Sequence, residues 1–266
     1  NTMSLGNSSS HSKNNFWFSV LFIWIIATLF DRVWWNFFSN TPSWDQADYL
    51  NSALDHGRAL SFLGEDGFVG FNSLLDLSPK IPPLASIVNG AVISLAGDAP
   101  YKAAWNLSLW NGFFIFNIAS WGLYLRGKKF ALFCVLISAF SPFLFNLRTD
   151  YVLELPLIST VTLYLFYLGK WSDNSNGGKW IQSIISSLAC ASSLLIKQSS
   201  LLLIIPSLLF IFILSFKKEK KFRIQFLFLI FINLLAVFPW FYHNWIMILS
   251  GTYRVVFVSA ALEGDP

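Results

Sequence analysis

The chain has 266 residues and a net charge of +4, with 55% hydrophobic and only 12% charged residues. Because an average soluble domain carries roughly 25% charged residues, this composition excludes a soluble globular domain. It equally excludes a disordered chain, a collagen and a disulfide scaffold. The 12 Trp, 28 Phe and 8 Tyr residues are typical of a membrane protein, whose aromatic side chains gather at the interface. The Lys and Arg residues form no stripe with base-stacking potential, so we expect no nucleic-acid partner.

Long unbroken apolar runs follow one another along the chain. They predict helices, because the strands of a membrane barrel alternate apolar and polar residues in segments of about ten. The runs cover residues 16–38, 81–97, 103–125, 130–147, 154–169, 181–196, 199–216 and 224–249. We predict an all-α, polytopic helical membrane protein with a disordered cytoplasmic tail at 1–15 and one transmembrane module at 16–266. Because the chain ends soon after an apolar segment, we expect it to be the N-terminal fragment of a longer protein.

The run at 81–97 differs from the others. It has 17 residues, carries Pro82 and Pro83 directly after its first residue, and has Asn89 and Gly90 at its middle. A span needs about 20 mostly apolar residues. We therefore predict an interfacial helix here, which leaves about seven transmembrane helices and a long first extracytoplasmic loop that contains interfacial helices.

The basic residues give these spans an orientation. With the N-terminus in the cytoplasm, eleven of the 18 Lys and Arg residues lie in inner segments, whereas every acidic residue except Asp173 and Glu219 lies on the outer face. Short inner loops rich in Lys and Arg are the usual pattern. An eight-span alternative, in which 81–97 crosses and the N-terminus is outside, satisfies the same rule but separates the residues that are grouped next.

Charged and polar residues collect on this outer face, beside the predicted interfacial helix. Several cations and carboxylates on one surface at membrane level are typical of a site for a lipid with an anionic head group. The candidate residues are Asp45, Asp48, Tyr49, Lys80, Arg148, Asp150, Glu154, Lys197 and Arg254.

Four short motifs carry a resemblance to a known family. They are an acidic motif at 45–49 (Asp-Gln-Ala-Asp-Tyr), a turn at 80–84 (Lys-Ile-Pro-Pro-Leu), an acid before Pro-Leu at 154–157, and a Lys at 197 with Pro-Trp at 239–240. In this order they resemble membrane glycosyltransferases of the GT-C fold that use a polyprenyl-phosphate sugar. The most similar group is that of the protein O-mannosyltransferases and lipid A aminoarabinose transferases. The sequence departs from the group's pattern at Gln46, Ile81 and Glu154.

The resemblance implies a role for each candidate. Asp45 would be the general base that takes the acceptor proton, and Asp48 and Glu154 would orient the acceptor or Asp45. Cations would stabilise the charge that builds on the departing lipid phosphate, and these are Lys80, Arg148 and Lys197. The secondary candidates are Tyr49, Asp150 and Arg254.

The implied reaction is an inverting transfer to an acceptor that is a protein, a glycolipid or a glycan. Its partners are a polyprenyl-phosphate sugar donor and the lipid bilayer, which agrees with the lack of a Gly-rich nucleotide loop in the sequence. We predict no cofactor and no metal-ligand set, because His56 and His243 stand alone, but a divalent metal is left open. We expect a multi-pass protein of a bacterial plasma membrane rather than the endoplasmic reticulum, with an extracytoplasmic active site.

Other interpretations of the same residues are kept open. Acidic residues in a wet loop are most often simply solvated, and a Lys near a helix end often extends to the interface. Arg148 and Asp150 would then form only a weak, exposed pair. At the level of function, the alternatives are a transporter or flippase for a lipid-linked or polar solute, and a non-catalytic membrane subunit.

Overall fold

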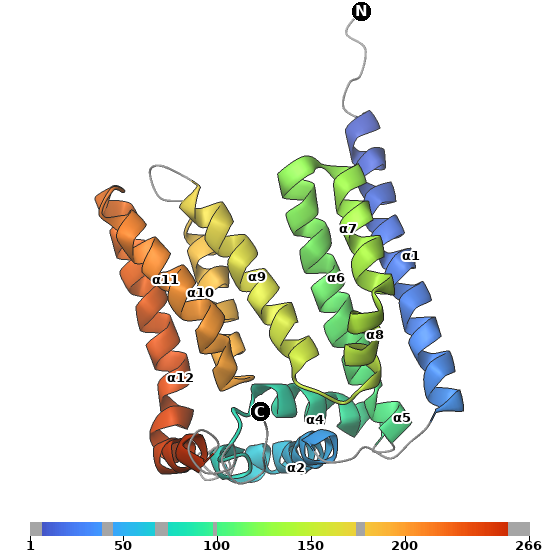
Figure 1. The fold of residues 1–266 in the computed structure, drawn as a ribbon, viewed down its shortest axis with the longest axis vertical. Coiled ribbons are helices and arrows are strands. Elements are labelled where there is room, and N and C mark those ends of the chain that lie inside the picture. The colour runs from blue at the N-terminus through green and yellow to red at the C-terminus, as the bar shows by residue number, and fades with distance from the viewer. Residues whose placement is uncertain (1–6, 39–44, 67–73, 98–99, 174–178, 255–266) are drawn as a thin grey trace, which may run out of the picture.

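A computed structural model describes residues 7–38, 45–66, 74–97, 100–173 and 179–254. Every regular element among these residues is a helix, which confirms the predicted all-α fold. The upright helices, which stand side by side in Figure 1, are α1 (Asn7–Phe37), α6 (Trp105–Arg126), α7 (Lys128–Phe140), α9 (Glu154–Ser172), α10 (Trp180–Leu194), α11 (Leu201–Ser215) and α12 (Lys220–Arg254). Across one end of this row lies what we call the end layer, which consists of α2 (Asp45–Asp66), α4 (Leu84–Ala96) and α5 (Pro100–Ala103).

Three helical stretches among the described residues are long and apolar enough to cross a membrane, namely Asn14–Phe37, Gln198–Ser215 and Lys220–Ser250. A fourth is obtained if α7 and α8 (Pro142–Thr149) count as one bent span. These stretches confirm a polytopic membrane protein. The helices α6, α9 and α10 stand upright in the same row (Figure 1) without meeting the same criteria, so the number seven stays a prediction.

Polar residues join the upright helices to one another. Asn117 of α6 donates from Nδ2 to Ser159 O of α9 at 3.0 Å, and Asn233 of α12 donates to Ser187 Oγ of α10 at 3.1 Å. Such hydrogen bonds hold helices together in a bilayer, where apolar burial gives no preference for a neighbouring helix over lipid. Asn117 also lowers the hydropathy of α6, whereas α10 is apolar but has only 15 residues.

The apolar run at 130–147 forms two helices rather than one. α7 ends at Phe140, α8 begins at Pro142, and their directions differ by 56°. Pro142 has no N–H to continue the hydrogen-bond ladder of α7, and its ring crowds the preceding turn. The proline therefore explains why a single helix over this run, as the apolar pattern suggests, does not form.

The polar N-terminal segment is helical in part. α1 begins at Asn7, so a helix replaces the disorder that we predicted for residues 7–15, and residues 1–6 lie outside the described part of the chain. Once the apolar stretch has nucleated a helix, each added residue costs little. This explains why α1 extends beyond the first apolar residue of the run, Phe16.

α4 corresponds to the run that we predicted to be interfacial, and it lies crosswise to the upright helices rather than parallel to them (Figure 1). With 13 residues and a rise of about 1.5 Å per residue, it is too short to span a bilayer. A Cβ on Gly90 would lie 2.5 Å from Ala53 O of α2, so the close crossing of the two helices requires glycine. Asn89 accepts a hydrogen bond from Trp110 Nε1 at 2.8 Å. The Asn-Gly pair therefore anchors α4 to α2 and α6 and does not interrupt it.

The connections opposite the end layer are rich in basic residues. α6, α9 and α11 end, and α7, α10 and α12 begin, on the side of the bundle where α1 begins, at the top of Figure 1. Gly127 connects α6 to α7 with a φ of +82°, a conformation that suits glycine. The basic residues in or beside these connections are Arg126, Lys128, Lys129, Lys170, Lys179, Lys217, Lys218, Lys220, Lys221 and Arg223.

Candidate functional site

A pocket of about 200 Å³ lies in the end layer. It is formed by the first turns of α2, the start of α4 and the segment 77–81 that leads to α4. Its lining has several hydroxyl groups together with one carboxylate and one ammonium group, and it consists of Asp48, Tyr49, Ser52, Leu77, Ser78, Pro79, Lys80, Ile81 and Ser86. The pocket therefore brings together three of the residues that the sequence predicts for the site.

Tyr49 is surrounded by carboxylates from two parts of the chain. Its pKa is raised to about 12, first by burial and then by the nearby charges of Asp45, Glu154 and Asp48. Because the phenol stays protonated at neutral pH, it can donate a hydrogen bond to a ligand. Asp45 and Asp48 lie exposed in the first turn of α2, so the start of α2 and the start of α9 face the same space.

Glu154 and Lys197 form an ion pair in which neither side chain is fully buried. The ammonium group donates to Glu154 Oε1, and the exposed fractions of the side chains are 39% for Glu154 and 30% for Lys197. Glu154 begins α9, where the helix dipole favours a negative charge. Lys197 directly precedes the short 3-10 helix η1 (Gln198–Ser200). Since an ammonium group has three N–H donors, Lys197 can bind a second anion while it holds Glu154.

Backbone contacts hold Lys80 next to the turn that carries Lys197. Gln198 Nε2 donates to Lys80 O at 2.8 Å, and Leu84 N donates to Leu195 O at 2.9 Å. The segment that leads into α4 is therefore bound to the turn after α10, and the two lysines that we predicted for phosphate binding lie on adjoining segments. The side chain of Lys80 is exposed.

The last part of α12 contacts the segment just before Lys80. Three side chains on one face of the helix reach it, with spacings of three and four residues. The contacts are Trp240 Nε1 to Ser78 O (3.2 Å), His243 Nε2 to Asp76 Oδ1 (2.5 Å) and Asn244 Nδ2 to Leu75 O (3.2 Å). We expected His243 to stand alone. The helical spacing of the three residues is visible in the sequence, but their partners, 162 to 169 residues earlier, are not.

Arg148 lies in a different environment from the one that we predicted. It is 2% exposed, and its Nε donates to Asp31 Oδ2 of α1 at 2.9 Å. This buried pair replaces the weak, exposed pair with Asp150, and the described lining of the pocket does not include Arg148. Each buried charge needs its partner to offset the loss of water. Asp31 precedes Arg148 by 117 residues, and no spacing in the sequence pointed to the pairing.

The structure defines the two remaining candidates less closely. Asp150 is exposed, and partial burial raises its pKa. Arg254 is the last residue of α12, and its side chain lies outside the described set. Among the described residues there is no group of three or more His, Cys, Asp or Glu that could hold a metal ion.

The arrangement combines three kinds of chemistry within a small volume. The carboxylates can accept a proton. The hydroxyl groups and Asp48 offer the donors and acceptors that the hydroxyls of a sugar require, and the lysines can bind an anion such as a phosphate. The residues come from α2, the segment 77–81, the start of α4, the start of α9 and the turn after α10, so the site exists only in the folded chain.

A known protein family matches a stretch of the chain that includes part of this site, whereas Asp45, Asp48 and Tyr49 lie before it. A family model described as dolichyl-phosphate-mannose-protein mannosyltransferase matches residues 80–243, which is more than half of the chain. The matched region begins at Lys80, ends at His243, and includes Glu154 and Lys197. No curated protein and no solved structure gives a significant match. The chain therefore belongs to the dolichyl-phosphate-mannose-protein mannosyltransferase family and is a membrane glycosyltransferase of the GT-C type.

Proposed function

We propose that this protein transfers a mannosyl residue from a polyprenyl-phosphate donor to an acceptor, with inversion at the anomeric carbon. The observation that carries the proposal is the meeting of distant segments at the end layer. Asp48, Tyr49 and Lys80 line one pocket, and Gln198 binds the backbone of Lys80 beside Lys197. A hydroxyl-rich pocket that adjoins two ammonium groups suits a sugar joined to a phosphate.

Asp45 is our candidate for the general base. It is exposed at the first position of α2, one turn before Tyr49. The acceptor hydroxyl attacks the anomeric carbon and gives its proton to this carboxylate, while the bond between that carbon and the phosphate oxygen breaks. Asp48 and Glu154 orient the acceptor or Asp45.

Lys80 and Lys197 are our candidates for binding the lipid phosphate. Their charges stabilise the negative charge that the phosphate gains as the sugar leaves. We leave Arg148 out of this set, because its charge is already offset by Asp31 in a buried pair.

We further propose that the end layer lies on the non-cytoplasmic face. The support is the distribution of basic residues, which flank the connections at the opposite end of the row (Figure 1). Loops rich in Lys and Arg normally stay in the cytoplasm. A lipid donor can reach this face within the membrane, and the acceptor can reach it from the extracytoplasmic solution.

The test is the transfer of labelled mannose from polyprenyl-phosphate mannose by the full chain in lipid nanodiscs, with peptide and glycolipid acceptors. Asp45→Asn should lower the rate by at least about 100-fold, the usual contribution of a general base. The matched control is Asp55→Asn, since Asp55 is exposed on the same helix and pairs only weakly with Arg58 at 3.3 Å. Equal rates for the two variants would rule out Asp45 as the base.

The same assay tests the phosphate site and the alternative class of function. Lys80→Ala should raise the donor KM, whereas Lys102→Ala, which removes an exposed lysine of α5, should not. If the wild-type chain moves a solute across a sealed vesicle but never transfers a sugar, the protein is a transporter and the proposal is wrong.

A further inference from the structure

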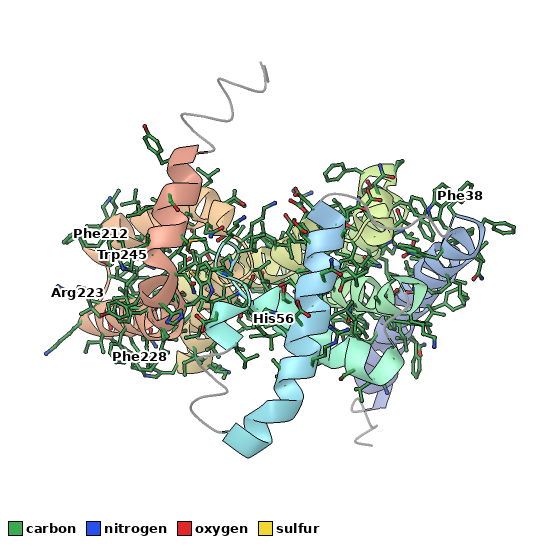
Figure 2. All side chains as sticks on the ribbon, turned by 90° about the horizontal axis from the view of Figure 1, so that it is seen from below. Phe38, His56, Phe212, Arg223, Phe228 and Trp245 are labelled. Atoms are coloured by element: carbon green, nitrogen blue, oxygen red, sulfur yellow. The ribbon has the colours of Figure 1, made fainter. Side chains whose placement is uncertain are left out.

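The last part of α12 is bent toward the end layer. Pro239 lies inside this helix, and near the lower end of Figure 1 the helix departs from its upright direction. A proline removes one backbone hydrogen bond and crowds the preceding turn, which kinks a helix. Seen from below in Figure 2, the bent part of α12 lies on one side of the molecule and α2, marked by His56, lies nearer its middle.

The bent part of α12 contacts the chain before Lys80 at Leu75, Asp76 and Ser78. Trp240 and Asn244 donate to the backbone oxygens of Ser78 and Leu75, and both side chains are buried, at 2% and 5% exposure. His243 contacts the carboxylate of Asp76, which is exposed. The two buried donors bind backbone groups. They therefore fix the path of the backbone in this segment.

Ser78 connects these contacts to Lys80. The hydroxyl of Ser78 donates to Ile81 O at 2.7 Å, which closes a turn around Pro79 and Lys80. Ser78 and Lys80 both line the pocket. A change in the position of the Ser78 backbone must therefore move the Lys80 backbone with it.

We propose that Trp240 is a positioning residue that sets the place of Lys80 for binding the lipid phosphate. The inference rests on the proposed function, because it takes Lys80 as a phosphate ligand, and it extends that function to a helix outside the predicted site. Misplacement of a binding group by about 1 Å is enough to weaken its action strongly. The kinked end of α12 thereby governs donor affinity, while the acid–base chemistry depends on α2.

The experiment measures the binding of a short-chain polyprenyl phosphate without sugar to the full chain in nanodiscs. Trp240→Phe keeps an aromatic ring and removes the donor N–H. We expect binding about five- to tenfold weaker, as for the loss of one hydrogen bond, and faster amide exchange in residues 74–81. The matched control is Trp245→Phe, because Trp245 lies on the same helix but is 54% exposed, on the outer side in Figure 2; it should change neither quantity.

The same substitution in a second variant distinguishes an effect on the position of Lys80 from a general loss of structure. In a Lys80→Ala chain, Trp240→Phe should weaken binding no further, since it acts through Lys80. An equal loss in both backgrounds, or equal binding by the Trp240 and Trp245 variants, overturns the proposal. If Trp240→Phe does not fold, Asp76→Asn weakens the same set of contacts at an exposed residue and should give the same pattern on a smaller scale. Failure of the proposed function looks different, because the wild-type chain then binds no polyprenyl phosphate, and the positioning role fails with it.

Discussion

Two ion pairs join distant helices, and they differ mainly in their access to water. Arg148 and Asp31, between α8 and α1, have side chains that are 2% and 1% exposed. Lys197 and Glu154, before α11 and at the start of α9, are 30% and 39% exposed. The buried pair has no room to exchange partners, so it holds helices together. The half-exposed pair can open toward a ligand, so the ammonium group of Lys197 and the carboxylate of Glu154 are available to bind it.

The buried pair is also incompletely satisfied. Asp31 Oδ1 and Arg148 Nη1 have no hydrogen-bond partner among the described groups. Unsatisfied buried atoms cost free energy, and an ion pair of this kind often stabilises a fold no better than well-packed apolar side chains do. We therefore expect the fold to be about equally stable with both partners present or with both replaced by apolar residues, and less stable when only one partner is present.

Removing one partner of the buried pair has the largest expected effect. Arg148→Leu leaves the buried Asp31 without its hydrogen-bonded partner, which should lower the free energy of unfolding by about 3–5 kcal/mol. Replacing Asp31 by Leu as well should recover most of this loss. Thermal unfolding of the detergent-solubilised variants measures both changes, and a single variant as stable as wild type would remove the structural role that we assign to the pair.

The next largest effect is expected in the end layer, where α2 and α4 pack closely against each other. In Gly90→Ala the new Cβ would lie 2.5 Å from Ala53 O and 2.6 Å from Gly57 N. Forcing α2 and α4 apart should cost about 1–3 kcal/mol and disturb the pocket that they form. Gly169→Ala is the matched control, because nothing lies within 4 Å of its Cβ. Unfolding and donor binding are compared for both variants, and similar behaviour would mean that the crossing can relax.

The half-exposed pair should show the reverse pattern to the buried one. Lys197→Ala should change the free energy of unfolding by no more than about 1 kcal/mol, since a partly exposed pair contributes little. Its effect should appear in the affinity for polyprenyl phosphate, because Lys197 is a proposed phosphate ligand. A large loss of stability with unchanged affinity would place this pair in the same class as Asp31 and Arg148.

The smallest effect is expected at Tyr49. Its pKa is about 12 in the folded chain, above the usual value of about 10, so the neutral phenol stabilises the fold fully below pH 10. That contribution is lost as the pH rises from 10 to 12. Tyr49→Phe should therefore be less sensitive to pH in this range than wild type, with little change at pH 7. Parallel stability curves for the two proteins would show that the phenol is not held among the carboxylates.

Much of this architecture could be predicted from hydropathy and from proline positions. The short run at 81–97 indicated a helix that does not cross, and α4 lies crosswise to the upright helices (Figure 1). The predicted orientation of the spans placed Asp48, Tyr49 and Lys80 among the candidates on one face, and all three line the pocket. The role of Arg148 could not be predicted in this way, because a cation beside Asp150 looks the same in the sequence whether it faces water or a buried carboxylate.

The contact between Trp240 and Ser78 spans 162 positions, and this has a consequence for biosynthesis. A chain leaving the ribosome makes the first part of the pocket long before it makes α12. Until α12 has been inserted, the segment that carries Lys80 lacks one of its supports. The nascent protein should consequently acquire its full affinity for the lipid donor only after α12 has been inserted into the membrane.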